Sequence, residues 1–525
     1  MKIDFSHYTS LIIIIPLVLS AFTHLWNPLG FPTLHVDEGH YMRRAMQVLK
    51  GLGPQEPTSE YANAYEHPYF GQLFLAATFK IIGYPDSLSP KVGDMHSVEL
   101  LYLVPRVLMG LLAVLDTFLI YKIADRRYNQ NVAFIAAILF AVMPMSWMTR
   151  GIFLDSILLP LFLLSLLFAI YADGINDIDL AKRNKKKSLV ILSGIFLGLA
   201  IFTKAPVFTM IPLIAFMILK NNYKKFKGLT MLWFTPVILI PLIWPAYAML
   251  TGHFDEWLTG VLYQIERESD KTLYHSLTLI FKIDPVLLTL GTAGFVYTLI
   301  KRDYFLLLWI IPYLLFLYHS GWVTHFHWIL LIPALCIAAA ILLQDSSNRI
   351  RSRKKVTQIL GLGMISAFVI FGLVTTITLI TLNLNSSYLE IYGFTVQELQ
   401  HRSEAIKENN ETLTVIGGQR IKALMWIPQY VFNINVSFRD TDNPKDNFTM
   451  PVEKNEKLVL IVDPSLRSKL LQYVGGDEKY ERIGKIYHDS DTIATFINKE
   501  SERYDFLNTE ENHGLGHFVE VKAKY

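Results

Sequence analysis

The sequence predicts an α-helical polytopic membrane protein with about 11 transmembrane helices and a C-terminal α/β domain outside the membrane. The chain has 525 residues, of which 52% are hydrophobic and only 18% are charged, whereas soluble proteins carry about 25% charged residues. The apolar residues stand in long blocks, which is typical of spans of about 20 residues. Basic residues cluster in the loops between alternate blocks.

The apolar blocks give a list of candidate spans. The first block is preceded by one lysine and lacks a clear small-residue cleavage site, so we interpret it as a retained first helix. The single cysteine, Cys336, lies inside an apolar run, so no internal disulfide is expected. The candidate spans are residues 11–30, 99–121, 131–148, 152–172, 188–204, 205–220, 229–250, 277–300, 304–320, 327–344 and 358–383.

The basic loops predict the orientation of the chain. They follow every even-numbered span, at residues 122–127, 182–187, 220–227, 301–302 and 349–355. Cytoplasmic loops are enriched in Lys and Arg. The N-terminus is therefore predicted to be cytoplasmic, and the first loop (31–98), the loop 251–276 and the C-terminal segment extracytoplasmic, in the plasma membrane or the endoplasmic reticulum.

The C-terminal segment, 384–525, has a different composition from the spans. Leu413–Ile416 and Leu458–Val462 have strand length, and Ser465–Tyr473 and Asp491–Asn498 look helical, so we expect a small α/β domain beside a transmembrane domain of residues 1–383. The glycan acceptor pattern N-x-[ST] fits an external domain, although polar segments also collect it by chance. It occurs only at Asn385, Asn410, Asn435 and Asn447.

The first external loop carries the strongest candidate for chemistry. Asp37 and Glu38 are the first acidic pair after the first span. One carboxylate could take a proton from an acceptor hydroxyl while the other orients it. Alternatively, the pair caps a helix over 38–50, because carboxylates favour an N-terminal turn. His35 and His40 flank the pair, so a divalent metal at His35, Asp37 and His40 is a weaker alternative. The apolar stretch 69–83 is too short to span and is expected to be an interfacial helix.

Ionisable residues also lie at the outer ends of the spans. Arg106, Arg150, Asp155 and Lys204 all fall at the external side of the predicted topology. Such residues are costly in a membrane and mark sites or ion pairs, and cations at headgroup depth suit a lipid phosphate. The alternatives are snorkelling, or for Asp155 a structural pair with an arginine.

Two further external segments are candidates for substrate contacts. The segment 321–328 contains His325 and His327 among aromatic residues, which fits an interfacial belt or contact with a sugar or lipid headgroup. The loop 251–276 is rich in charge, and we expect a solvated face or an acceptor contact.

At these residues the chain resembles the protein O-mannosyltransferase family and its polytopic GT-C relatives, which use lipid-linked sugars. The stretches that carry the resemblance are Asp37-Glu38 with Tyr41, the segment 67–73 (HPYFGQL), the segment 150–158 (RGIFLDSIL), and Ser193-Gly194 with Gly198 and Lys204. The match covers roughly residues 30–210.

The resemblance implies a sugar, expected to be mannose, on a dolichyl or other polyprenyl phosphate, and inversion at the anomeric carbon. It implies that Asp37 is the base, that Glu38 and Glu66 hold the acceptor and the loop, and that Arg106, Arg150 or Lys204 stabilises the departing phosphate. His67, Asp155, His325 and His327 are further candidate substrate contacts.

The acceptor stays open among protein, glycan and lipid, as in the relatives that modify lipid A with aminoarabinose. Tyr69 and Gln72 replace a proline and a lysine of the family segment, and no large insert occurs in a late external loop. The Trp-Trp-Asp signature of oligosaccharyltransferases is absent.

Two other classes of protein compete with the enzyme. A transporter or flippase of a lipid-linked sugar should have repeated halves and polar groups in the middle of the membrane, and we find neither in the sequence. A membrane-anchored binding protein would leave the set of Asp37, Arg150 and Lys204 without a role. Nothing in the composition points to nucleic acid.

Overall fold

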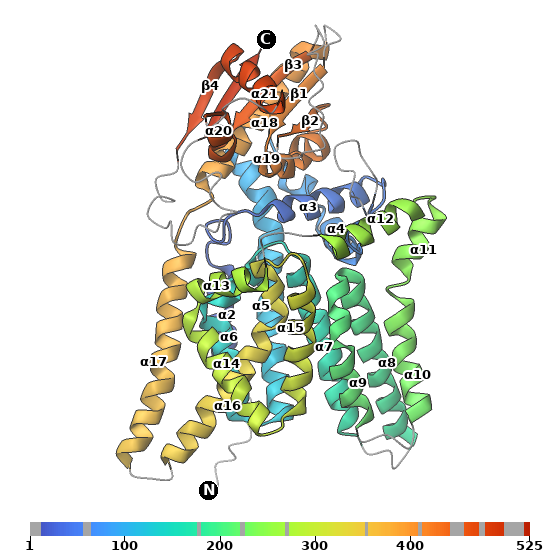
Figure 1. Ribbon diagram of the computed structural model, residues 1–525, viewed down its shortest axis with the longest axis vertical. Helices are drawn as coiled ribbons and strands as arrows, with labels where there is room; N and C mark the ends of the chain where they lie inside the picture. Colours follow the sequence, from blue (N-terminus) through green and yellow to red (C-terminus); the bar gives the residue numbers. More distant parts are fainter. Residues whose placement is uncertain are drawn as a thin grey trace. The chain divides into compact units, whose positions relative to one another are not determined.

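The computed structural model is mostly helical, with one mixed β-sheet (Figure 1). It forms two compact units that interleave along the chain: residues 1–28, 63–71 and 107–381 belong to the first, and residues 29–62, 72–106 and 382–525 to the second. The residues that the structure describes are 12–55, 65–175, 180–220, 226–267, 272–351, 355–407, 412–441, 456–471, 478–497 and 519–524.

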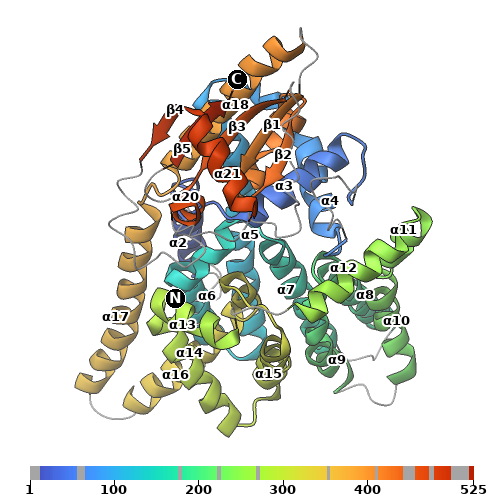
Figure 2. The same cartoon turned by 45° about the horizontal axis from the view of Figure 1, so that its top comes forward.

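The first unit is a bundle of apolar helices. Within it α8 packs against α7 and α10, while α16 packs against α6 and α14 (Figures 1 and 2). The helix α5 (Met95–Arg127) has residues in both units. The helices are α2 (Ile14–Leu25), α6 (Gln130–Val142), η2 (Pro144–Arg150), α7 (Leu154–Asp173), α8 (Leu180–Thr203), η3 (Ala205–Met210), α9 (Ile211–Leu219), α10 (Phe226–Leu239), α11 (Ile243–Leu250), α12 (Phe254–Glu266), α13 (Leu273–Ile283), α14 (Pro285–Ile300), α15 (Tyr304–His319), η5 (His325–Leu330), α16 (Ile332–Arg351) and α17 (Lys355–Ile380).

The helices agree with an integral membrane protein. Among the described residues, four helices are long and apolar enough to cross a membrane by themselves, and up to seven spans result if each bent helix pair counts as one. Each of the 11 predicted stretches overlaps a helix, but the number of spans stays a prediction.

Two of the predicted spans are not straight helices. The stretch 131–148 is divided between α6 and η2, which are bent by 68°, and the stretch 277–300 is divided between α13 and α14, which are bent by 117°. In both pairs a proline opens the second helix, at Pro144 and Pro285. Proline disfavours helical geometry in the residue before it and donates no backbone hydrogen bond, so the helix ends there.

Close helix packing in the first unit depends on glycine. A Cβ atom added at Gly294 of α14 would lie 2.3 Å from the carbonyl oxygen of Ala338 on α16, and one at Gly291 would lie 2.9 Å from Cβ of Leu335. Small residues allow helix backbones in membranes to approach closely. These two glycines therefore set the distance between α14 and α16.

The second unit contains a five-stranded sheet with strand order β2-β1-β3-β5-β4. The first three strands are parallel, whereas β5 is antiparallel to both β3 and β4. The prediction of an α/β fold in the C-terminal segment is thereby confirmed. The elements are α3 (Val36–Leu49), α4 (Phe70–Ile82, from Gln72 on), η1 (Asp86–Leu88), α18 (Ser386–Lys407), β1 (Thr412–Gly417), α19 (Gln419–Leu424), the π-helical η6 (Ile427–Val431), β2 (Ser437–Asp440), β3 (Glu456–Val462), α20 (Pro464–Leu471), α21 (Glu478–Asp489), β4 (Asp491–Phe496) and β5 (Val519–Lys524).

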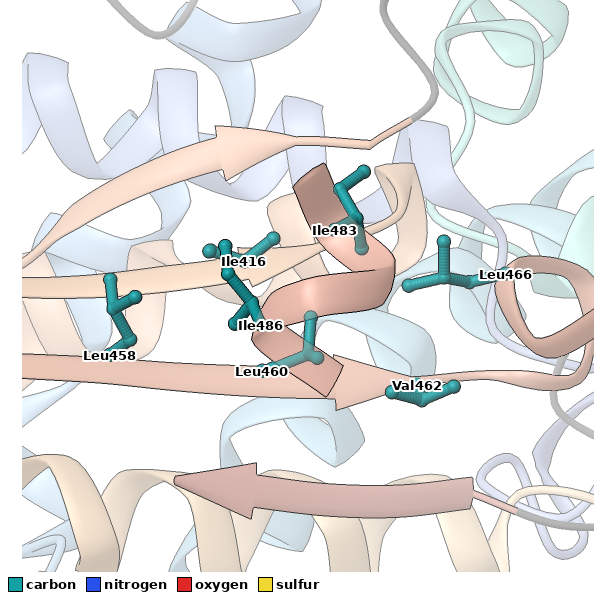
Figure 3. Packing of buried hydrophobic residues seen from close by; sticks show 7 residues of the cluster. All are labelled: Ile416, Leu458, Leu460, Val462, Leu466, Ile483 and Ile486. Carbon is teal, nitrogen blue, oxygen red and sulfur yellow. The ribbon is translucent and has the colours of Figure 1, made fainter. Parts of the chain in front are cut away.

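The sheet is covered on one face by α20 and α21. Apolar side chains of β1 and β3 pack against both helices and exclude water, which favours folding by burial of apolar area (Figure 3). The members of this core are Ile416, Leu458, Leu460, Val462, Leu466, Ile483 and Ile486.

The predicted strands 413–416 and 458–462 and the predicted helix near Ser465 are confirmed as β1, β3 and α20. The helix predicted at Asp491–Asn498 is wrong, because residues 491–496 form β4. The partner of β4 is β5, more than 20 residues further along the chain. Whether such a short segment forms a strand or a helix depends on pairing with a distant strand, and the local sequence pattern does not reveal that pairing.

Candidate active site

The acidic pair of the first loop lies in the first turn of α3. His35 is the N-cap: its Nδ1 accepts a hydrogen bond from the backbone N–H of Asp37 at 3.2 Å, and its own N–H donates to Oε1 of Glu38 at 3.0 Å. This reciprocal arrangement is a capping box, which satisfies N–H groups that a helix start leaves open. Glu38 therefore has the helix-capping role that the sequence analysis considered for the acidic pair. Asp37 takes part in the cap only through its backbone N–H.

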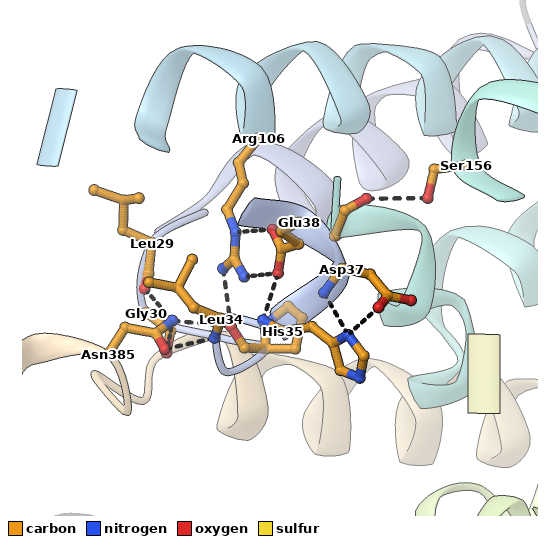
Figure 4. A network of polar contacts seen from close by, with 11 residues as sticks. Leu29, Gly30, Leu34, His35, Asp37, Glu38, Arg106, Ser156 and Asn385 are labelled. Carbon is orange, nitrogen blue, oxygen red and sulfur yellow. Dashed lines mark hydrogen bonds and ion pairs between the residues drawn. The ribbon is translucent and has the colours of Figure 1, made fainter. Parts of the chain in front are cut away.

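Glu38 is held in a buried salt bridge with Arg106 of α5 (Figure 4). Nε of Arg106 lies 3.0 Å from Oε2 and Nη2 lies 2.7 Å from Oε1, and neither side chain has exposed surface. Nη1 of Arg106 also donates to the carbonyl oxygen of Pro32 at 2.8 Å. A two-point arginine–carboxylate contact fixes both partners geometrically, so it anchors the start of α3 to α5.

Asp37 differs from its neighbour. Its side chain is 26% exposed, and Oδ1 lies 3.8 Å from Nδ1 of His35. Among the described residues, none donates a hydrogen bond to the Asp37 carboxylate. The Glu38 carboxylate is thus engaged in a buried salt bridge, whereas the Asp37 carboxylate is accessible to a substrate group.

The histidines that flank the pair do not form a metal site. Within the described residues, no group of three His, Cys, Asp or Glu side chains is placed to hold a metal ion. Nδ1 of His35 is engaged as the helix cap. The arrangement of His35, Asp37 and His40 therefore gives the metal alternative no support.

The loop before α3 is held by Asn385, a residue that the sequence analysis considered only as a glycan acceptor. Its Nδ2 donates to the carbonyl oxygens of Leu29 and Pro32 at 2.6 and 2.9 Å, and its Oδ1 accepts from the N–H of Leu34 at 2.8 Å (Figure 4). Asn385 is 1% exposed, so its carboxamide is a structural group. In the sequence, the only sign that Asn385 has this structural role was its position directly after the last predicted span.

In the first unit, the Lys204 and Asp155 side chains form an ion pair. Nζ of Lys204 lies 2.6 Å from Oδ2 of Asp155, and the two side chains are 5% and 4% exposed. The same ammonium lies 4.8 Å from the centre of the Phe326 ring, within cation–π distance. The sequence analysis considered an arginine as the partner of Asp155, and the structure pairs it with Lys204.

Arg150 is buried beside the end of α2. Its Nη2 donates to the carbonyl oxygens of Trp26 and Asn27 at 2.5 and 2.9 Å. These bonds orient the guanidinium.

The segment 325–328 is buried in the first unit, and the interfacial belt considered for 321–328 stays a prediction. Nδ1 of His327 accepts a hydrogen bond from the N–H of Thr324 at 3.1 Å, which starts η5. The ring of His325 packs on Trp147 with 5.8 Å between centroids. Lys204, His67 and His325 lie close enough to His327 to act on it electrostatically, so the structure brings four of the predicted site residues together.

Glu66 and His67 precede α4. Oε2 of Glu66 accepts a hydrogen bond from Nε2 of Gln264 on α12 at 3.4 Å. Nearby, Tyr69 packs edge-on against Phe202 and Tyr247, and burial raises its pKa to about 12. The sequence analysis did not identify Gln264, because it lies about 200 residues away in a loop that we interpreted as a solvated face.

Solved structures define the class of protein to which this fold belongs. The oligosaccharyltransferase of Archaeoglobus fulgidus with a tethered acceptor peptide aligns at a TM-score of 0.57 and 14% identity, over 89% of this chain and 70% of its own. ArnT from Cupriavidus metallidurans bound to undecaprenyl phosphate aligns at a TM-score of 0.53 and 14% identity, over 99% of this chain and 98% of its own. The chain has the fold of the GT-C glycosyltransferases, as the sequence predicted.

A family model narrows this class for part of the chain. Residues 95–248 match the family model described as dolichyl-phosphate-mannose-protein mannosyltransferase. The resemblance drawn from the sequence is thereby confirmed. Among curated proteins, none matches the chain.

Proposed function

We propose that the chain is an integral membrane glycosyltransferase. It transfers a sugar from a polyprenyl phosphate to an acceptor hydroxyl, with Asp37 as the general base. The hydroxyl oxygen attacks the anomeric carbon from the face opposite the phosphate, the carbon–oxygen bond to the phosphate breaks, and the configuration inverts. Asp37 takes the hydroxyl proton, and the polyprenyl phosphate leaves with the bonding electron pair.

The observation that carries this proposal is the different state of the two adjacent carboxylates. Both oxygens of Glu38 are engaged by Arg106, whereas Asp37 is partly exposed and accepts no hydrogen bond from the described residues. A general base needs a carboxylate that an acceptor hydroxyl can reach. Glu38 accordingly has a supporting role, which is to fix the turn that presents Asp37.

The lipid-linked donor is supported by the relatives. ArnT was solved with undecaprenyl phosphate, and the archaeal oligosaccharyltransferase AglB, which aligns at a TM-score of 0.56 and 12% identity over 90% of this chain and 71% of its own, was solved with a dolichol-phosphate. In our proposal Arg150 and Lys204 stabilise the departing phosphate, whereas the guanidinium of Arg106 is engaged by Glu38. Fixed positive charge lowers the barrier where negative charge develops.

The description of the matched family favours mannose as the sugar and a protein hydroxyl as the acceptor. The basic loops favour an extracytoplasmic site, because they assign the first loop to the side opposite the cytoplasm. Glycan and lipid acceptors remain part of the test, since Tyr69 and Gln72 depart from the family segment.

The test is a transfer assay with the full-length protein in liposomes. Radiolabelled dolichyl-phosphate mannose is offered with Ser/Thr peptides, glycans and lipids as separate acceptors. We expect transfer by the wild type and a loss of about 10²–10⁴-fold in kcat for Asp37→Asn. Asp86→Asn is the matched control, because Asp86 is an exposed carboxylate of the same first loop, and it should transfer at the wild-type rate.

The same liposomes separate an enzyme from a flippase. The chain would be a transporter and not a glycosyltransferase if the labelled lipid moved between leaflets without forming product and Asp37→Asn did not affect this movement. Full transfer by Asp37→Asn would eliminate this residue as the base.

A further inference from the structure

The C-terminal segment touches the proposed catalytic loop at two separate places. The first is Asn385, whose buried carboxamide bonds to three residues of the loop 29–34. The N–H of Leu384 adds a hydrogen bond to the carbonyl oxygen of Gly30 at 3.0 Å. The backbone that leads into Asp37 is therefore fixed by residues more than 350 positions away.

The second place is one face of α3. Gly39, Arg43, Gln47 and Lys50 are spaced by three or four residues, so they form a single stripe along the helix. Every member of this stripe meets the segment 419–433.

The contacts along this stripe are specific. Gly39 faces Ala423 of α19, and Nη1 of Arg43 donates to Oε1 of Gln429 at 3.0 Å. The Arg43 guanidinium also lies 5.4 Å from the centre of the Tyr430 ring.

Further along, Nε2 of Gln47 donates to the hydroxyl of Tyr430 at 3.1 Å, and Nζ of Lys50 lies 3.3 Å from Oδ1 of Asn433. A Cβ atom on Gly39 would lie 2.2 Å from the carbonyl oxygen of Ala423, so α3 and α19 are in backbone contact two residues after the proposed base.

We propose that the C-terminal segment is a positioning element of the active site, in which Asn385 fixes the loop before Asp37 and residues 419–433 fix the helix after it. This inference rests on the proposed function, because it assigns these residues to the placement of the base. A displacement of about 1 Å at a reacting group costs roughly 10²-fold in rate. The contacts of Asn385 before Asp37 and of residues 419–433 after it restrict such displacement.

Asn385 is suited to this task by its chemistry. A carboxamide supplies two N–H donors and an acceptor on one rigid plane, and here the donors meet carbonyl oxygens while the acceptor meets an N–H. An aspartate of the same size has no donors and would set a carboxylate against the carbonyl oxygens of Leu29 and Pro32.

The test compares Asn385→Asp with Asn435→Asp in the transfer assay. Asn435 is an exposed asparagine of the same compact unit and serves as the matched control. We expect at least a tenfold lower kcat for Asn385→Asp, a donor KM within twofold of the wild type, and faster amide hydrogen exchange confined to residues 29–50. Asn435→Asp should leave all three quantities unchanged.

A second pair of variants covers the case in which Asn385→Asp does not fold. Gly39→Ala pushes α3 from α19, and Gly484→Ala places the same methyl group on α21, where no described residue lies within 4 Å. Gly39→Ala should lower kcat at least tenfold with an unchanged donor KM, and Gly484→Ala should not.

Three results would overturn the inference or its basis. If variants with faster amide hydrogen exchange over residues 29–50 kept the wild-type kcat, the contacts of the C-terminal segment would not determine the position of Asp37 in catalysis. Unchanged exchange over residues 29–50 in Asn385→Asp would show that the loop is not held by this residue. If the wild type transfers no sugar from any donor, the proposed function fails, and the exchange measurement alone still decides whether Asn385 holds the loop.

Discussion

Glu38 and Arg106 form a two-point salt bridge that has no exposed side-chain surface on either partner. The pair joins the first turn of α3 to α5 and leaves the adjacent Asp37 as the accessible carboxylate. Removing one partner of such a pair leaves an uncompensated buried charge, whereas removing both leaves none.

We therefore predict that Glu38→Gln destabilises the protein by about 3 kcal/mol. The double variant Glu38→Met with Arg106→Met should recover at least half of this loss, since neither charge is then buried. Unfolding in detergent followed by circular dichroism measures both. Equal destabilisation in the single and double variants would show that the pair itself contributes the stability.

The ion pair of Lys204 and Asp155 predicts opposite effects on phosphate binding. Lys204→Met removes a cation and should weaken binding of a short-chain polyprenyl phosphate about tenfold, the equivalent of one charge-assisted hydrogen bond. Asp155→Asn frees the ammonium from its partner and should tighten binding. Titration calorimetry measures the affinities, and Lys185→Met, an exposed lysine of α8, is the control. Weaker binding in Asp155→Asn would assign the pair to structure alone.

The glycine contact between α14 and α16 predicts a packing defect. Gly294→Ala places a methyl group 2.3 Å from the carbonyl oxygen of Ala338, so the helices must separate, at a cost of about 1–3 kcal/mol. Gly363→Ala puts the same group on α17, where none of the residues that the structure describes lies within 4 Å, and alanine favours helix. The midpoint temperature of thermal unfolding should therefore fall only for Gly294→Ala. An equal fall in both variants would exclude the contact between α14 and α16 as the cause.

His40 predicts a pH dependence of stability. Burial lowers its pKa in the folded protein to about 4, from 6.5 in the unfolded chain. The unfolded state therefore binds the proton first, and stability is lost as the pH falls from about 6.5 towards 4.

The midpoint of thermal unfolding should fall over this pH range by less in His40→Gln than in the wild type. The reference variant is His96→Gln, at the exposed His96 of the same unit. Parallel pH profiles for the wild type and His40→Gln would contradict the prediction.

The two described glycan acceptor patterns predict different occupancy. Asn385 is buried with its carboxamide fully engaged, whereas Asn435 is exposed. After expression in a eukaryotic host, we expect a glycan at Asn435 and none at Asn385, as measured by mass spectrometry of glycopeptides. A glycan at Asn385 in folded, active protein would contradict the buried position. Asn410 and Asn447 lie outside the described residues.

Several elements were predictable because their signal is local. The helices expected near 69–83 and over 38–50 appear as α4 and α3 within a few residues of the expected bounds, and the interfacial position of α4 stays a prediction. The strands β1 and β3 are short runs of buried apolar residues. The state of β4 was not predictable, because its hydrogen bonds come from β5.

The sequence by itself predicted a membrane protein with the GT-C fold, because long apolar blocks and family motifs are properties of neighbouring residues. It also identified Asp37 and Glu38 as a pair worth attention. Only the tertiary structure distinguished them, since the partners of Glu38 and of its loop, Arg106 and Asn385, are 68 and about 350 residues away. Which charges are buried and paired depends on contacts between distant segments, and these exist only in the folded chain.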